Sequence, residues 1–202
     1  FANASIFYTL DGSAPDTSST FYTAPFALTN SVVVRAIAYD SSFASALSAP
    51  MPVSFFHSYP LTASAEGGGR ILLAPAGAVY REGTVVMAAA EAESGWRFLR
   101  WMGDLAGTED RASVLMDRPK RIQAVFGTTV QISVRGGGSI RLNPRLPVYE
   151  YGSMPQAVAI PDPGNYFGLW GGAAFGNTNP VTLTLTNATP EISALFGALP
   201  PG

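Results

Sequence analysis

The side chains that could carry chemistry are few and scattered. The only histidine, His57, begins a short segment with the composition of a linker, whereas a hydrolytic triad needs a histidine that a third group holds beside its nucleophile. Glu91 and Glu93 fall on one face of an expected strand, but paired carboxylates hydrolyse glycosides only when they flank a cleft. The sequence has no cysteine, which removes thiolate nucleophiles and thiolate metal ligands. We therefore expect no catalytic residue and no enzyme activity.

The elements that would position such residues follow an internal duplication. LTASAEGGGRILLAP, from Leu61, aligns with VQISVRGGGSIRLNP, from Val130, at one constant offset. The same offset pairs glycines and aromatic residues further on: Gly95 with Gly164, Phe98 with Phe167, and Trp101 with Trp170. A fixed spacing of this kind is the signature of a repeated module. It predicts repeats at 59–127 and 128–197, after a different module at 1–58 and before a linker at 198–202.

Alternating apolar and polar residues predict strands throughout the chain. Val130, Ile132 and Val134 alternate with polar residues up to the triple glycine, and a second alternating run follows it. Because glycine supplies the positive φ of tight turns, this pattern predicts a hairpin in each repeat. The alanine-rich segment 85–94 would suit a helix, but its aligned partner, 157–164, contains prolines that exclude a helix interior. We expect an all-β fold of three small modules in tandem.

Composition and charge exclude several functions. The chain is 47% apolar and 13% charged, with a net charge of −2 and no strongly basic region. Nucleic acids bind to concentrated positive charge, so no nucleic-acid partner is expected. No apolar run approaches the roughly 20 residues of a membrane-spanning helix.

Two aromatic residues are candidate ligand contacts. Trp101 and Trp170 occupy the same repeat position, which favours a core role for both. Trp96 aligns with Asn165, so the repeat does not need a tryptophan there. If a tryptophan of this chain contacts a glycan, it is Trp96, with Tyr166 in the other copy, because flat aromatic rings stack on sugar faces. The alternative, which we favour, is that Trp96 is a partly exposed side chain that covers the sheet.

Cofactors and metals are not expected. Asp104, Glu109 and Asp110 share one loop and could offer oxygen ligands to calcium. The aligned loop of the second repeat, 173–179, contains no carboxylate. Turn capping and solvation therefore explain these acidic residues better than a metal site.

Two family resemblances follow from particular motifs. The segment FYTLDGSAPDTSSTFYTAPFALTNSVVVRAIAYD, from Phe7, resembles the chitobiase/β-hexosaminidase C-terminal type of domain, a small fibronectin-III-like β-sandwich. The two repeats resemble divergent internalin-B-type bacterial repeats, with the Gly-x-x-Phe-x-x-Trp-x-Gly core present as GWRFLRWMG (95–103) and GNYFGLWGG (164–172). The resemblance implies a β-sandwich followed by two homologous antiparallel β-sheet repeats. It also implies a secreted or surface-attached bacterial protein.

The first module departs from its family in one way. Members usually carry one or two strands before the Tyr-Thr-Leu-Asp-Gly motif, whereas here only six residues precede Phe7. We expect the module to lack its first strand, which is either cut off where this sequence begins or supplied by a neighbouring subunit. The partners expected are other domains of the same polypeptide or copies of the chain, with cell-surface glycans as a further candidate. The function expected is that of an extracellular spacer or filament subunit, with a carbohydrate-binding accessory region of a polysaccharide-degrading enzyme as the alternative.

Overall fold

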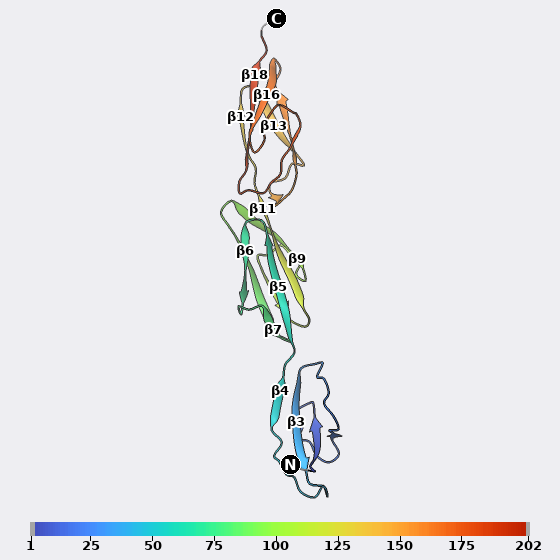
Figure 1. The fold of residues 1–202 in the computed structure, drawn as a ribbon. Coiled ribbons are helices and arrows are strands. Elements are labelled where there is room, and N and C mark those ends of the chain that lie inside the picture. Colours follow the sequence, from blue (N-terminus) through green and yellow to red (C-terminus); the bar gives the residue numbers. More distant parts are fainter. Residues whose placement is uncertain (1–2, 201–202) are drawn as a thin grey trace. The chain divides into compact units, whose positions relative to one another are not determined.

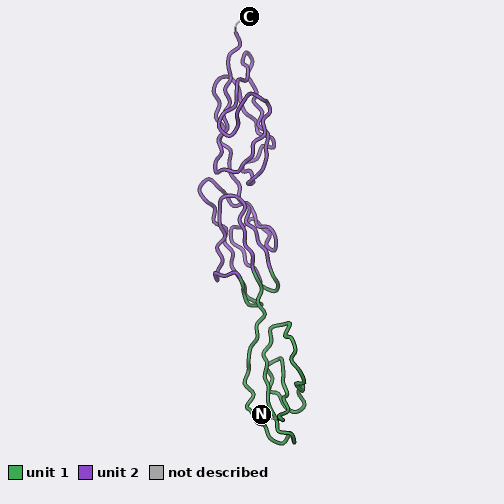
Figure 2. Tube along the Cα trace, in the orientation of Figure 1, with its two compact units in different colours: residues 1–60, 79–84, 116–119 green, residues 61–78, 85–115, 120–202 purple. Residues whose placement is uncertain are grey.

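The computed structural model describes residues 3–200, and these residues form strands, turns and loops with no helix. The all-β prediction is therefore confirmed. Part of the predicted linker, residues 201–202, lies outside the described residues. No helix of the described residues is long and apolar enough to cross a bilayer. The chain divides into two compact units, residues 1–60, 79–84 and 116–119, and residues 61–78, 85–115 and 120–202 (Figure 2).

The first module contributes one four-stranded sheet to the first unit (Figure 1). Its strands, in the sheet order β2-β1-β3-β4, are β2 (Thr20–Phe21), β1 (Ser5–Thr9), β3 (Val32–Tyr39) and β4 (Pro52–Phe55). The β-branched run Val32–Val34 suits the pleated strand that pairs with both β1 and β4. A sandwich needs two such layers, and described residues 3–58 supply one of them.

The first repeat contains seven strands. They are β5 (Ser58–Glu66), β6 (Gly69–Ala74), β7 (Val79–Arg81), β8 (Val85–Ala92), β9 (Trp96–Gly103), β10 (Arg111–Leu115) and β11 (Lys120–Thr128). One sheet has the order β10-β8-β6, and the other is built around β11, which pairs with β5 and β9. The alanine-rich segment is the strand β8, as the prolines of its aligned segment in the second repeat predict.

The second repeat follows the same plan. Its strands are β12 (Gln131–Arg135), β13 (Gly138–Asn143), β14 (Tyr149–Glu150), β15 (Gln156–Pro161), β16 (Asn165–Gly172), β17 (Val181–Thr182) and β18 (Glu191–Ala198). They form sheets of order β12-β18-β16 and β13-β15-β17. The expectation of antiparallel sheets holds for every strand pair of the two repeats except one in each. The first strand of each repeat runs parallel to the last, as β5 with β11 and β12 with β18.

The predicted glycine hairpins are wrong. β5 and β6 belong to different sheets, as do β12 and β13, so each triple glycine carries the chain from one layer to the other. The glycines serve close packing as well as the turn. Gly67 has φ of +93°, and a Cβ on Gly69 would lie 2.3 Å from the Phe126 ring. A Cβ on the corresponding Gly138 would lie 2.6 Å from the Phe196 ring, so the layer crossing and the ring packed against its third glycine recur together.

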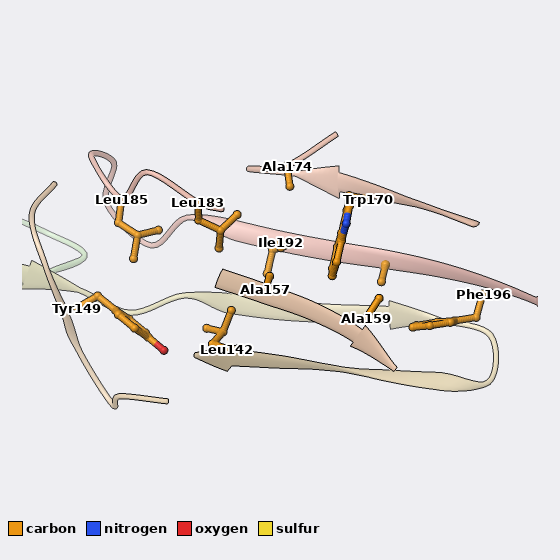
Figure 3. Close-up of a cluster of buried hydrophobic side chains, with 11 residues drawn as sticks. Leu142, Tyr149, Ala157, Ala159, Trp170, Ala174, Leu183, Leu185, Ile192 and Phe196 are labelled. Atoms are coloured by element: carbon orange, nitrogen blue, oxygen red, sulfur yellow. The ribbon is translucent and has the colours of Figure 1, made fainter. Parts of the chain in front are cut away.

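The core of the second repeat lies between its two sheets (Figure 3). Trp170 is 2% exposed, packs against the tilted ring of Phe167 at a ring-centroid distance of 4.9 Å and donates its indole N–H to the Thr178 carbonyl at 2.9 Å. Trp101 of the first repeat is 3% exposed and makes the same bond to the Glu109 carbonyl. The predicted core role of both tryptophans is confirmed. An indole N–H that is buried needs an acceptor, which fixes the loop after each Trp strand.

Candidate functional site

The two repeats share a strand. β11 pairs with β9 as the last strand of the first repeat, and its final residues, Gly127 and Thr128, pair with β14 of the second repeat. The same residues that complete one sheet therefore begin the next repeat. A shared strand leaves no flexible linker at this point, because each of its residues is held by ladder hydrogen bonds.

Thr128 is the buried polar centre of this junction. Its side chain is 0% exposed, and its hydroxyl donates to the Gly95 carbonyl at 3.2 Å. The same oxygen accepts the backbone N–H of Thr189 at 2.8 Å. One hydroxyl thus ties a turn of the first repeat to a loop of the second, with both of its hydrogen-bonding roles used.

Trp96, which the sequence singles out as a candidate glycan contact, lies at the same junction. Its indole covers Gly68, where an added Cβ would lie 2.2 Å from Nε1, and it meets the Tyr151 ring at a centroid distance of 5.9 Å. Tyr166 lies elsewhere, half exposed on Gly197 at the other end of the second repeat. The structure therefore does not bring Trp96 and Tyr166 together, and their binding role stays a prediction.

An ion pair closes the junction on its exposed side. The Arg100 guanidinium binds both carboxylate oxygens of Glu150, with Nη2 to Oε2 at 3.1 Å. The hydrogen bonds from Arg100 lower the pKa of the Glu150 carboxyl. Because this pKa is lowered on folding, the pair stabilises the folded chain above the ordinary carboxyl pKa, and that contribution is lost as the pH falls through the lowered value. Both side chains are partly solvated, so the pair contributes no more than about 1 kcal/mol to stability.

The junction residues of the first repeat are not preserved in the second. Trp96, Arg100 and Thr128 align with Asn165, Leu169 and Ala198. Comparison of the two repeat sequences singled out only Trp96, and it did so as a candidate glycan contact. The mismatches at the other two positions carry the same signal, but their partners, Glu150 and Thr189, lie 50 and 61 residues away along the chain.

The other residues considered for chemistry have structural surroundings. His57 is exposed, and its Nδ1 lies 3.3 Å from the Tyr59 hydroxyl. Glu91 is bound by Arg70, and Asp104 accepts the backbone N–H of Arg121 at 2.8 Å. Among the described residues, no group of three or more His, Asp or Glu side chains could hold a metal ion.

The aspartates of the first module are turn residues. Each accepts hydrogen bonds from the serine two residues further on, and these bonds lower the pKa of each carboxyl: Asp11 from Ser13, Asp16 from Ser18, and Asp40 from Ser42. This is the pattern of an Asx turn, in which the carboxylate replaces a backbone acceptor. It explains the aspartates without a ligand.

The first module leaves most of its large apolar side chains exposed. Its buried hydrophobic residues are Phe7, Ile37 and Ala38 among the described residues up to 58. Aromatic rings cluster around Phe7, with Phe21 at 5.4 Å and Phe43 at 5.8 Å between centroids. Nevertheless both rings are 48% exposed. A sheet with apolar residues on both faces normally has a second layer against it.

Close-packed β-repeats joined by a shared strand define a segment of tandem β-modules. The chain matches the divergent InlB B-repeat domain over residues 59–129 and 128–199 and belongs to this family. Residues 1–49 match the chitobiase/beta-hexosaminidase C-terminal domain. Both resemblances are thereby confirmed. No curated protein and no solved structure matches the chain. Domains of both kinds are accessory, non-catalytic modules typical of bacterial surface or extracellular proteins.

Proposed function

We propose that the chain is a structural and adhesive segment of a secreted or surface-attached bacterial protein, with its repeats acting as a stiff spacer. The observation that carries this proposal is the shared strand β11, which ends one repeat and opens the next. A spacer keeps its length only when adjacent modules do not swing freely. Thr128, Trp96 and Arg100 supply contacts that oppose such motion.

The experiment exchanges the junction residues for their counterparts in the other repeat. A chain with Trp96→Asn, Arg100→Leu and Thr128→Ala should keep both repeats folded, because the second repeat folds with Asn, Leu and Ala at these positions. Residual dipolar couplings should fit one alignment tensor for both repeats in the natural chain and require two in the variant. The free energy of unfolding, measured by thermal unfolding, should fall by roughly 1–3 kcal/mol, which is the cost of leaving a buried hydrogen-bonding group unpaired.

Thr128→Ser is the matched control. It keeps the hydroxyl that bonds to Gly95 and Thr189, so one tensor should still fit. If the couplings of the two repeats already require two separate tensors in the natural chain, the repeats do not act as a stiff spacer.

Completion of the first sheet by a strand from another copy of the chain extends this proposal. β4 is an edge strand, and Val53 and Phe55 on it are 53% and 46% exposed. An edge with unpaired backbone groups and apolar side chains is a template for strand addition. Such pairing would link copies into a filament or dock the module on its neighbour.

Edge pairing predicts concentration-dependent association. Sedimentation velocity should show species larger than the monomer that grow with protein concentration, and Val53→Lys should abolish them, because an edge lysine opposes strand addition. Met154→Lys, at a residue of the second repeat that is 65% exposed, should leave association unchanged. A monomer at every concentration would rule out pairing between copies.

A further inference from the structure

The outer face of the sheet β10-β8-β6 carries an apolar groove. The strand register places Leu72 opposite Ala89 and Ala74 opposite Met87. Leu72 and Met87 are 45% and 47% exposed and form the walls. The two alanines are short enough to leave a hollow between them, and the groove measures about 760 Å³. That volume lies within the range of small-molecule sites in proteins.

The fold does not require this face to be apolar. The second repeat has the same sheet, β13-β15-β17, with Arg141 in place of Leu72 and Gln156 in place of Met87. Ala74 likewise aligns with Asn143. Two copies of one module thus fold with apolar side chains at these three positions in one copy and polar side chains in the other. Apolar side chains in contact with water give up burial energy, so their presence in one copy indicates something that covers them.

One end of the groove carries an available positive charge. Arg111 lines the groove opposite Ala89, and its guanidinium has no ion pair or hydrogen bond to the described part of the chain. The neighbouring Glu91 does not compete for it. Arg70 binds that carboxylate through Nε at 2.9 Å and Nη2 at 2.6 Å. The groove therefore has apolar walls and a free cation at its end.

We propose that this groove binds a small amphiphile with a linear apolar body and a carboxylate head, the body lying between Leu72 and Met87 and the head on Arg111. A peptide is a poorer occupant, because the groove is floored by side chains on a sheet face and would leave backbone N–H and C=O groups unpaired. A second copy of the chain is also disfavoured. A stable protein interface needs about 800 Å² from each partner, well beyond what a few half-exposed side chains offer.

The test uses octanoate and octan-1-ol with the whole chain. Calorimetry should show saturable binding of octanoate, and amide shifts should map to the strands β6 and β8. Leu72→Arg with Met87→Gln installs the polar face of the second repeat and should remove binding. Arg111→Ala should weaken octanoate about tenfold, the effect of one charge-assisted contact, and leave octan-1-ol unchanged.

Thermal unfolding verifies that the variants fold, and Arg111→Ala, at an exposed side chain, is expected to fold in any case. Met154→Gln, at a residue of the second repeat that is 65% exposed, is the matched control and should not alter binding. The proposal is overturned if octanoate binding does not saturate, if Met154→Gln weakens it as much as the groove variant, or if Arg111→Ala weakens the alcohol and the acid equally.

Discussion

Replacing Trp170 with alanine should lower the free energy of unfolding of the second repeat by about 4 kcal/mol, within the range for a buried tryptophan truncated to alanine. Trp170 is 2% exposed and lies at the centre of the cluster between the two sheets. The truncation leaves a cavity beside Phe167 and removes the hydrogen bond to the Thr178 carbonyl. Denaturant unfolding followed by the amide signals of the second repeat measures the loss.

Two further variants separate the contribution of the hydrogen bond from that of the buried ring to the loss of stability. Trp170→Phe keeps an aromatic ring but leaves the Thr178 carbonyl without its donor, so about 1–2 kcal/mol of the loss should remain. Phe175→Ala removes an aromatic side chain that is 90% exposed and should change stability by less than about 0.5 kcal/mol. A loss for Trp170→Ala no larger than that for Phe175→Ala would show that the tryptophan does not hold this core.

The strands of this protein could be predicted from the sequence because they depend on local patterns. Alternation around Val130, Ile132 and Val134 marks an extended segment whatever its partner. The duplication adds evidence that the first copy alone does not contain. The prolines near residue 161 in the second copy exclude a helix there, which predicts that the aligned segment 85–94 of the first copy is a strand. Pattern and repetition together therefore fixed the class and the order of elements.

The pairing of those strands could not be predicted in the same way. A glycine turn between two alternating runs has the same sequence whether the runs pair with each other or lie in opposite layers. Here β5 pairs in parallel with β11, the last strand of its repeat, and not with β6. Local propensity carries no information about a partner that lies at the other end of the repeat.

The junction shows the same limit. Trp96 differs from its aligned residue, Asn165, and this mismatch marks a position outside the core that the two repeats share. The indole of Trp96 packs against Tyr151, a residue of the next repeat that only the fold brings near. A sequence comparison can thus locate an exceptional residue without identifying its partner.

Gly69→Ala should destabilise the first repeat by about 3 kcal/mol, because the added methyl group overpacks the core. Its Cβ would lie 2.3 Å from the ring of Phe126, which is 0% exposed. Gly69 does not have a positive φ, so backbone strain is not the cause. Thermal or denaturant unfolding of the variant, compared with the natural chain, gives the magnitude.

A second glycine distinguishes lack of space from backbone strain. Gly83 has φ of +81° and nothing within 4 Å of an added Cβ, so Gly83→Ala should cost only the roughly 1–2 kcal/mol of placing an L-residue in the left-handed region. Phe126→Leu should reduce the additional loss caused by Gly69→Ala, since a smaller side chain relieves the overlap, while the Gly83→Ala loss should be unaffected. Losses that simply add for Gly69→Ala and Phe126→Leu would mean that the third glycine is required for some reason other than the ring above it.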